Sequence, residues 1–433
     1  MLQPLFKAFT AFALMLYVSS AQAVLTINIE EGYDNALPIA LVPLAAEPGL
    51  DVPQDLAQIV ADNLNRSGHF KPVSRSLLPA KPSEMEQIDY NQWRILGTDY
   101  MLIGKVGRSE PGHFMVDMKF VDVLRKQVLV NKRWNKVRPD QLRRTAHVMS
   151  DAIYQSIMGV RGAFSTQIAY VTLQKQGKQR LYTLEVADAD GFNSQSILRS
   201  YEPIMSPSWS PDGKTLAYVS FENQRPEIFV QSVYGTYRKK IAGFKGINSA
   251  PAWSPDGTKL AMTLSKDGNA DIYIMEMATG RLQKVTSNRA IETEAAWSPD
   301  GTKLYFSSDR RGQPQVFKLN LNTMKVDRMT YEGKYNSNVD VSPDGRTLAI
   351  VHNRGEGFHI ALMDLVSGDF TSMTDTFLDE SPSFSPNGEM ILYAMNKNDR
   401  GQLAVIDKEG KASQVLQVIN AEVREPAWGP YLD

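Results

Sequence analysis

The distribution of hydrophobic and polar residues divides the chain into two regions. Up to about residue 160, segments with apolar residues every three or four positions alternate with short apolar runs, which is typical of a mixed α/β domain. From Ser165 onward, short segments with apolar residues at alternate positions are separated by turn-forming residues. The predicted fold class is therefore an α/β N-terminal domain followed by an all-β domain.

The first region, residues 35–160, has a simple predicted order of elements. Asp51, with Pro53 in the first turn, predicts the start of a helix that Gly68 ends, and a second helix is expected over 139–159. Strands are expected over 38–44, 100–106, 114–123 and 127–134. We expect one small sheet that carries its helices on one face.

A phrase repeats along the second region, residues 165–433. Copies of Trp-Ser-Pro-Asp-Gly, some of them weaker, place their central prolines at positions 211, 255, 299, 343, 386 and 430, with spacings of 44, 44, 44, 43 and 44 residues. Pro, Asp and Gly suit successive positions of a type I turn. Each copy lies between two strands, and two more strands follow. Four strands per repeat of this length predict the blades of a β-propeller.

The two ends of this region complete each other. Ile168-Ala169-Tyr170 aligns with Leu216-Ala217-Tyr218, so the region begins with a second strand that lacks a first. Pro426-Ala427-Trp428 is a first strand that lacks its successors. Together they predict one blade built from both ends and five blades between them, hence a closed six-bladed propeller. An open β-solenoid would not explain complementary halves.

The N-terminal 34 residues carry two further signals. Residues 1–23 combine Lys7, an apolar run and Ala21-Gln22-Ala23, which is the pattern of a secretory signal peptide. Residues 24–34 then alternate like a strand, which suits either an arm that binds a partner or an edge strand of the next domain. The alternating residues are Val24, Leu25, Thr26, Ile27, Asn28 and Ile29.

Composition and motifs argue against several classes of function. The net charge is −1 and there is no cysteine, so nothing attracts nucleic acid and no thiolate chemistry is expected. Beyond the signal peptide no apolar stretch is long enough to cross a bilayer. The basic residues between Arg125 and Arg144 are interpreted as a solvated surface, and the segment 188–193 as a turn and not a calcium loop. We expect no metal, no cofactor and no enzyme activity.

Topology predicts a working surface at one mouth of the propeller channel. The loops that lead into each first strand surround this mouth, and they differ between blades while the Ser-Pro-Asp-Gly turns repeat. The candidate binding residues in and beside these loops are Ile247, Ala250, Glu292, Thr293, Glu294, Asn336, Asp379 and Glu380. Two alternatives stay open, namely a hydrolase with Glu292 and Glu294 as an acid/base pair and a propeller that binds sugars or peptides.

The whole mature chain resembles the TolB family, the periplasmic components of the Tol–Pal system. The similarity rests on the order of signal peptide, α/β domain and propeller. Its most specific segments are Gly162-Ala163-Phe164, Ile168-Ala169-Tyr170-Val171, Asp190-Gly191 with Asn193, Met205-Ser206-Pro207, Thr376-Phe377-Leu378-Asp379-Glu380 and Pro426-Ala427-Trp428.

The resemblance implies a periplasmic adaptor that is not an enzyme. The channel mouth would bind the peptidoglycan-associated lipoprotein Pal, with matching positions at Ile247, Ala250, Thr293 and Glu294, where Ile247 departs from the polar residue expected. The arm from Val24 to about residue 34 would bind the inner-membrane protein TolA. Other outer-membrane lipoproteins and colicins are further partners that it implies, and envelope constriction at cell division and outer-membrane integrity are the implied roles.

Overall fold

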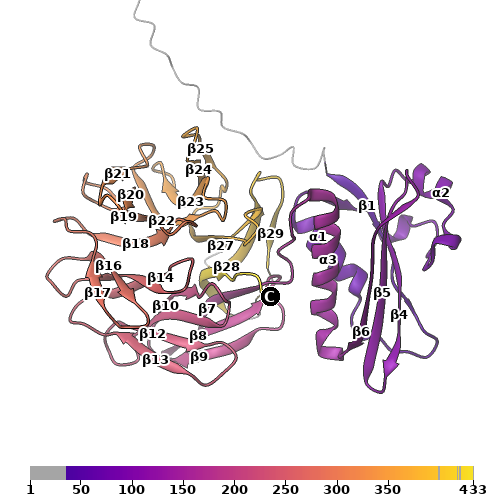
Figure 1. Cartoon of the computed structure of the whole chain (residues 1–433), viewed down its shortest axis with the longest axis horizontal. Coiled ribbons are helices and arrows are strands. Elements are labelled where there is room, and N and C mark those ends of the chain that lie inside the picture. The colour runs from indigo at the N-terminus through magenta and orange to yellow at the C-terminus, as the bar shows by residue number, and fades with distance from the viewer. Residues whose placement is uncertain (1–35, 398–399, 417, 419–420, 433) are drawn as a thin grey trace, which may run out of the picture.

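The computed structural model describes residues 36–397, 400–416, 418 and 421–432, which form two domains side by side (Figure 1). One is an α/β domain and the other a six-bladed propeller. The predicted fold class is therefore confirmed. The expected signal peptide and the arm at 24–34 lie outside the described residues.

The α/β domain is built on a mixed sheet with the strand order β3-β1-β4-β5-β6, in which β2 pairs with β4. Strand β1 is parallel to β3 and β4, whereas β4, β5 and β6 form an antiparallel meander. The strands are β1 (Leu37–Leu41), β2 (Ala45–Ala46), β3 (Phe70–Pro72), β4 (Tyr100–Glu110), β5 (His113–Asp122) and β6 (Gln127–Val137). The helices are α1 (Leu56–Arg66), α2 (Tyr90–Ile95) and α3 (Leu142–Met158), with 3-10 turns at Arg75–Leu77, Met85–Gln87 and Pro139–Gln141.

Both faces of this sheet are covered, although the pattern predicted helices on one face only. Ile39 and Leu102 pack with α1 and α3, whereas their neighbours Ala40 and Met101 pack on the other face with Trp93 of α2. Successive side chains of a strand point to opposite faces, so β1 and β4 feed two cores. Helices α1 and α3 lie between the sheet and the propeller (Figure 1).

The start of α1 differs from the prediction. Asp55, and not Asp51, is the N-cap, because its carboxylate accepts a hydrogen bond of 3.0 Å from the backbone N–H of Gln58. The predicted end of the second helix is correct, since Gly159 adopts the left-handed conformation (φ 77°) that caps α3.

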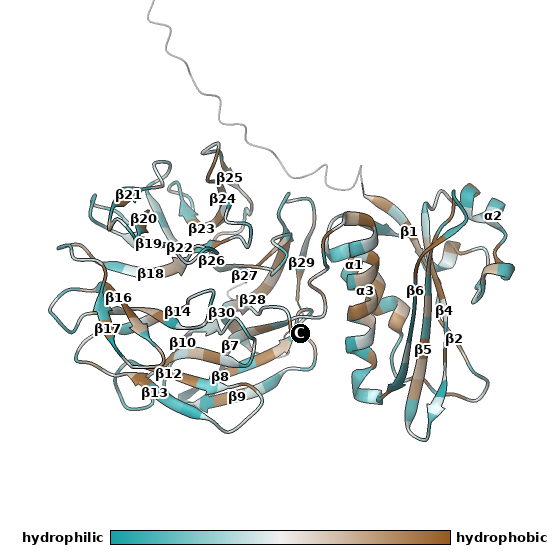
Figure 2. Ribbon diagram, viewed as in Figure 1, coloured by the Kyte–Doolittle hydropathy of each residue, from teal (hydrophilic) through white to brown (hydrophobic). Residues whose placement is uncertain are grey.

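Each blade of the propeller is a four-stranded antiparallel sheet. The first five blades are β10 (Ile204–Trp209), β11 (Thr215–Ser220), β12 (Glu227–Ser232), β13 (Arg238–Ala242); β14 (Asn248–Trp253), β15 (Lys259–Leu264), β16 (Asp271–Glu276), β17 (Leu282–Lys284); β18 (Glu292–Trp297), β19 (Lys303–Ser308), β20 (Gln315–Asn320), β21 (Val326–Arg328); β22 (Tyr335–Val341), β23 (Thr347–Asn353), β24 (His359–Asp364), β25 (Phe370–Ser372); and β26 (Asp379–Phe384), β27 (Met390–Lys397), β28 (Arg400–Asp407), β29 (Ser413–Val415). Hydrophobic residues concentrate on these strands and on α1 and α3, and hydrophilic residues on the loops (Figure 2).

The sixth blade closes the ring as predicted. The C-terminal strand β30 (Glu422–Trp428) pairs with β7 (Gln167–Gln176), which continues into β8 (Gln179–Asp188) and β9 (Gln195–Ser200). The indole N–H of Trp209 then donates to the carbonyl of Ala427 at 3.1 Å, which joins the first blade to the last.

The Ser-Pro-Asp-Gly phrase forms the turn that the sequence predicts. In the second blade, the N–H of Gly257 donates to the carbonyl of Ser254 at 2.9 Å, and the Ser254 hydroxyl donates to Asp256 at 2.6 Å. This hydroxyl and the backbone N–H of Thr258 hold the pKa of Asp256 at about 2. Gly257 has φ +70°, and a Cβ there would lie 3.6 Å from Pro211 of the preceding blade, so successive turns pack into a ring.

Candidate functional site

The first strand of every blade lines the central channel, and each carries the same irregularity. Strands β10, β14, β18, β22, β26 and β30 contact one another in a ring, and each has a register shift against its neighbour at the equivalent position. At each shift one non-glycine residue adopts a left-handed conformation, with φ between 47° and 56°. These six bulge residues are Ser206, Ala250, Glu294, Asn338, Ser381 and Glu425. This conformation is costly for L-residues, and its recurrence in all six blades shows that the bulge is a regular part of the channel wall.

Both bulge residues that carry a carboxylate link neighbouring blades. Glu294 accepts hydrogen bonds from the backbone N–H of Asn338 at 3.0 Å and from the Ser307 hydroxyl at 2.9 Å. Glu425 likewise accepts a hydrogen bond from the backbone N–H of Ser206. Burial raises the pKa of Glu294, and it raises that of Glu425 to about 7, with repulsion from Glu380 adding to the effect.

Three of the candidate binding residues are buried and hold their own loops together. Glu292, Asn336 and Asp379 are 0% exposed, and each lies at the start of an inner strand and not in a loop. Glu292 forms an ion pair with Arg310, and the Asn336 amide donates to the carbonyl of Glu332 at 2.7 Å. Asp379 accepts hydrogen bonds from the hydroxyls of Thr374 and Thr376. The structure therefore places these side chains beneath the mouth, not on its surface.

The other candidates divide between the mouth and the channel. Ile247 is 44% exposed beside the mouth, and Thr293 is half-buried, with its hydroxyl 3.2 Å from that of Thr263. Ala250, Glu294 and Glu380 line the channel cavity. Glu292 and Glu294 bind different neighbours, so the structure does not arrange them as a convergent acid/base pair.

Sequence reasoning missed a set of exposed apolar side chains around the mouth. Five loops that lead into inner strands each present at least one such residue, with Ile247 and Leu378 as second ones in two of the loops. Five of these residues, one from each loop, have exposed fractions that range from 37% to 76%. We call them the apolar crown: Tyr201, Phe244, Ile291, Tyr331 and Phe377. Their recurrence around one opening makes the mouth a candidate interaction surface. Their signal in the sequence was the presence of a large apolar residue in each of these loops.

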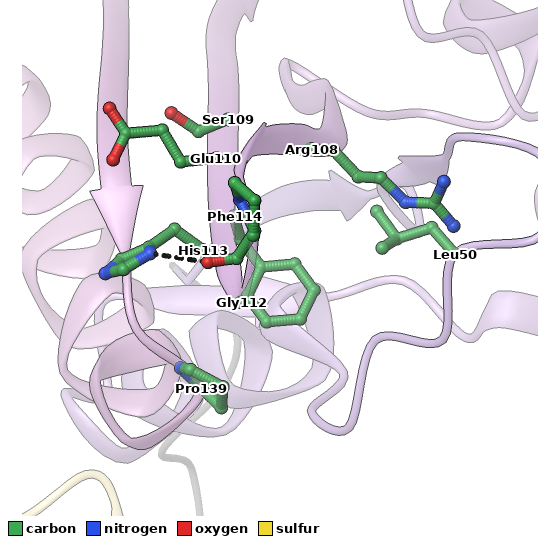
Figure 3. Close-up of a pocket in the computed structure, with 9 residues that line it drawn as sticks. Leu50, Arg108, Ser109, Glu110, Gly112, His113, Phe114 and Pro139 are labelled. Carbon is green, nitrogen blue, oxygen red and sulfur yellow. Dashed lines mark hydrogen bonds between the residues drawn. The ribbon is translucent and has the colours of Figure 1, made fainter.

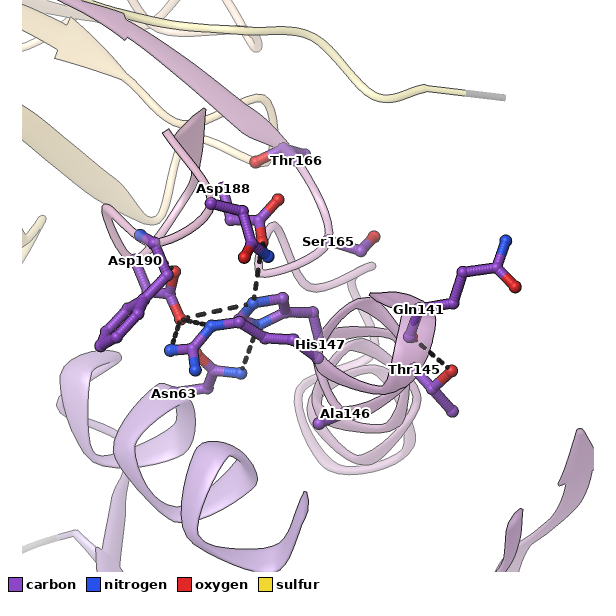
Figure 4. A network of polar contacts seen from close by, with 12 residues as sticks. Asn63, Gln141, Thr145, Ala146, His147, Ser165, Thr166, Asp188 and Asp190 are labelled. Carbon is purple, nitrogen blue, oxygen red and sulfur yellow. Dashed lines mark hydrogen bonds and ion pairs between the residues drawn. The ribbon is translucent and has the colours of Figure 1, made fainter. Parts of the chain in front are cut away.

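A buried polar cluster joins the two domains (Figure 4). We call it the domain joint, and it consists of Asn63, Arg66, Arg143, His147, Asp188 and Asp190. Asp190 accepts hydrogen bonds of 3.1 and 2.5 Å from the Arg143 guanidinium, and its carboxylate lies 3.3 Å from Nε2 of His147. The segment 188–193 is thus a strand connection, as predicted, and its two aspartates anchor the α/β domain.

The hydrogen bonds of the domain joint determine the tautomer of His147. The Asn63 carbonyl oxygen accepts from Arg66 at 3.1 Å, so its amide nitrogen faces Nδ1 of His147 at 2.9 Å and donates to it. The ring proton therefore lies on Nε2, which faces Asp190. Burial lowers the pKa of His147 to about 4 and keeps the ring neutral. His147, Asp188 and Asp190 are close enough to hold a metal ion, but a protonated Nε2 beside two arginines does not suit one.

The basic residues between 125 and 144 are largely paired with carboxylates. The exposed pairs agree with their interpretation as a solvated surface, but Arg143 does not, because it is 13% exposed and pairs with Asp190 in the domain joint. The ion pairs are Arg125–Asp122, Arg133–Asp117, Lys136–Glu110, Arg138–Asp140 and Arg143–Asp190.

A separate cavity of about 500 Å³ lies at the end of the β4–β5 hairpin (Figure 3). Leu50, Phe114 and Pro139 supply apolar walls, and the His113 ring nitrogen lies 3.2 Å from the carbonyl of Pro111. None of the candidate residues lines it.

The architecture defines a class of protein: a six-bladed β-propeller that contacts a small α/β domain through a buried polar cluster. A model of the TolB amino-terminal domain matches residues 25–129, and a model of the TolB β-propeller domain matches residues 154–432. The chain belongs to the TolB family of the Tol–Pal system. Within the described residues, no helix has the length and apolarity needed to cross a membrane.

Individual relatives are similar over nearly their whole length. The Tol-Pal system protein TolB of Hydrogenovibrio crunogenus is 59% identical over 418 residues, which cover 96% of each chain. That of Thioalkalivibrio sulfidiphilus is 57% identical over 95% of each chain. The crystal structure of TolB from Acinetobacter baumannii is 40% identical and covers 92% of this chain and 98% of its own, with a TM-score of 0.84.

Proposed function

We propose that this protein is a periplasmic adaptor, and not an enzyme, that binds the lipoprotein Pal through the propeller mouth and TolA through its N-terminal arm. In this role it supports outer-membrane integrity and envelope constriction at division. Colicins and other outer-membrane lipoproteins are candidate ligands of the same mouth. Membership of the TolB family supports the proposal, and the apolar crown is the single structural observation that carries it.

The crown gives the mouth the composition of a protein-binding surface. Tyr331 and Phe377 are 73% and 76% exposed, and aromatic side chains are enriched in protein–protein interfaces. Thr293 and Ile247 lie beside the crown, and Ala250 and Glu294 lie deeper in the channel. The buried Glu292, Asn336 and Asp379 would act indirectly, because they fix the loops that present the crown.

The arm at 24–34 is proposed as the TolA-binding segment from the family resemblance and from its strand-like alternation. Arm docking and lipoprotein binding would then bias one conformational equilibrium. Deleting residues 24–34 tests this idea, because unchanged lipoprotein affinity together with unchanged capture of TolA would contradict it.

A capture experiment tests the mouth. Wild-type protein and the Thr293→Arg, Glu294→Arg double variant are used to capture partners from envelope extract, and purified Pal domain is then titrated by calorimetry. We expect the double variant to lose the lipoprotein, because two cations would enter a surface that is apolar and acidic. An unchanged set of partners would overturn the site.

Two further variants separate binding from folding. Phe377→Asp changes a crown residue that is 76% exposed and should weaken Pal binding at least tenfold without lowering the melting temperature. Asp369→Arg with Thr371→Arg is the matched control, since both residues are exposed and lie on the outer β24–β25 hairpin. This control should bind Pal like the wild type.

Two alternatives remain, a hydrolase and a propeller that binds sugars or peptides. The hydrolase is disfavoured because Glu292 is tied to Arg310 beneath the surface. If the mouth binds sugars and not Pal, Phe377→Asp should not change the affinity for Pal, so the same titration distinguishes the two functions.

A further inference from the structure

The third position of the Ser-Pro-Asp-Gly turn is an aspartate in four blades and a different residue in the other two. In those four blades the aspartate accepts hydrogen bonds from the hydroxyl of the turn's serine and from the backbone N–H two residues later. The fifth blade has Asn387 at this position, and the broken final copy has Tyr431. An ionised aspartate only accepts hydrogen bonds, whereas an asparagine amide and a tyrosine hydroxyl also donate them.

Both exceptional residues donate to the same backbone oxygen. Nδ2 of Asn387 lies 3.0 Å from the carbonyl oxygen of Arg161, and the Tyr431 hydroxyl lies 3.1 Å from it. Oδ1 of Asn387 still accepts from the Ser385 hydroxyl at 2.7 Å and from the backbone N–H of Glu389 at 3.2 Å, so the turn keeps its form. The Arg161 guanidinium lies 4.1 Å from the centre of the Tyr431 ring. We call Asn387 and Tyr431 the linker socket.

Arg161 belongs to the segment that connects the two domains, residues 159–166. Its second half is held from both sides, because Asp151 of α3 accepts a hydrogen bond of 2.8 Å from the backbone N–H of Phe164, and Trp428 of β30 donates to the Thr166 hydroxyl at 2.8 Å. Its first half begins beyond the helix cap at Gly159 and is exposed. The linker socket holds this first half to the propeller.

The linker socket and the domain joint hold the two ends of α3. The helix lies between the propeller and the sheet of its own domain (Figure 1). Near its start, Arg143 and His147 contact Asp190 of the sixth blade. The chain then runs for roughly 18 Å of helix from His147 to Gly159, at about 1.5 Å per residue, before it reaches the socket. One attachment would allow the helix to pivot, whereas two separated attachments fix its direction.

We propose that the linker socket is a conformational latch that sets the angle between the α/β domain and the propeller. When the socket holds Arg161, both ends of α3 are fixed and the domains keep one orientation. When it releases Arg161, the α/β domain changes its angle while both domains stay folded, because the socket binds a linker carbonyl and belongs to neither hydrophobic core. The latch does not depend on the proposed binding of Pal and TolA.

Limited digestion with trypsin tests the latch, because trypsin cleaves after arginine by attack on the carbonyl that the socket holds. Asn387→Asp with Tyr431→Phe removes both donors but keeps the acceptor in the turn and the ring beside the Arg161 guanidinium. In the mature protein, cleavage between Arg161 and Gly162 should be at least tenfold faster in this double variant than in the wild type. Mass spectrometry measures it relative to cleavage after the exposed Lys178.

The matched control is Asp344→Asn. It makes the reverse exchange at the equivalent position of the fourth blade, where the turn binds no part of the linker. Its cleavage after Arg161 should match that of the wild type.

Distances between two spin labels measure the angle itself. The chain has no cysteine, so Lys132→Cys on β6 and Lys239→Cys on β13 place one label at an exposed position of each domain. We expect a single narrow distance distribution from the labelled wild type and from the labelled Asp344→Asn control. The socket double variant should give a broader distribution or a second maximum, with an unchanged circular dichroism spectrum.

Three outcomes would overturn the proposal. Equal cleavage after Arg161 in the wild type and the double variant would show that the socket does not restrain the linker. Faster cleavage with an unchanged distance distribution would show that only the linker frays. An equal effect of Asp344→Asn would assign the change to the turns in general. If the double variant does not fold, Tyr431→Phe alone decides by the same two measurements.

Discussion

Replacing Asp190 with alanine should weaken the connection between the two domains. Its carboxylate is 8% exposed and is the partner that the structure gives to Arg143, whose side chain is 13% exposed. Burial alone would raise the pKa of Asp190, but His147, Arg66 and Arg143 outweigh it and lower that pKa. Alanine would leave two largely buried guanidinium groups with one fewer counterion.

The expected loss is large because the pair is desolvated. Removing one partner of a buried ion pair costs about 3–5 kcal/mol. With an unfolding entropy of roughly 2 cal/mol/K per residue, a loss of about 4 kcal/mol lowers the melting temperature by roughly 5 °C for a unit of about 400 residues, but by roughly 15 °C for a unit of about 125 residues. The size of the shift therefore reports whether the α/β domain unfolds with the propeller or alone.

Differential scanning calorimetry of the wild type, Asp190→Ala and Asp190→Asn measures this shift. Asparagine keeps an acceptor for the backbone N–H of Phe192 and should be less destabilising than alanine. Arg138→Ala is the matched control, because the Arg138–Asp140 pair is exposed and its loss should leave the melting temperature unchanged. A shift below 1 °C for Asp190→Ala would refute the view that the domain joint holds the domains together.

Three further predictions concern the scaffold and its response to pH. Trp428→Ala should lower the free energy of unfolding by about 3–5 kcal/mol, measured by chemical denaturation. Trp428→Phe should lower it by less, because phenylalanine loses only the hydrogen bond to the Thr166 hydroxyl and part of the packing. Equal effects of the two variants would contradict this. Gly257→Ala should cost about 1 kcal/mol, because φ +70° is strained for alanine although its Cβ would meet Pro211 without a clash at 3.6 Å; an unchanged midpoint would show that the turn relaxes. His147 has a folded-state pKa of about 4, below that of the unfolded chain, so the free energy of unfolding that depends on its neutral form is lost as pH falls from 6.5 towards 4. Over this range the free energy of unfolding of His147→Gln should fall less than that of the wild type, by on the order of 3 kcal/mol. Parallel pH profiles of the two proteins would exclude the effect.

The sequence was most informative where local chemistry repeats. Pro, Asp and Gly at fixed spacing define a turn without help from distant residues, and the incomplete copies at 168–170 and 426–428 were sufficient to predict closure. The start of α1 was wrong by four residues, because both Asp51 and Asp55 can cap a helix and only the contact with Gln58 decides between them.

The candidate site was predicted in location but not in detail. Loop variation indicated the mouth, and five of the variable loops present an exposed apolar residue such as Tyr331. Polarity alone suggested Glu292, Asn336 and Asp379, yet all three are buried. A carboxylate at the start of a strand faces solvent or a loop according to which cation or hydroxyl folds over it. Arg310 lies 18 residues from Glu292, too far for a local pattern to reveal the contact, and the nearby Thr374 reaches Asp379 only because the loop between them folds back.

By itself, the sequence determined the repeat, the number of blades and the turn that ends each inner strand, because these depend on residues within a few positions of one another. Only the tertiary structure decided what the repeat encloses. The six bulges turn a variable position of each blade toward a common channel, which is lined by carboxylates from separate blades, namely Glu294, Asp340, Glu380 and Glu425. The domain joint likewise brings Asn63 to His147, which lies 84 residues away. Burial, charge and tautomer are properties of such assembled neighbours, so they arise only when the chain has folded.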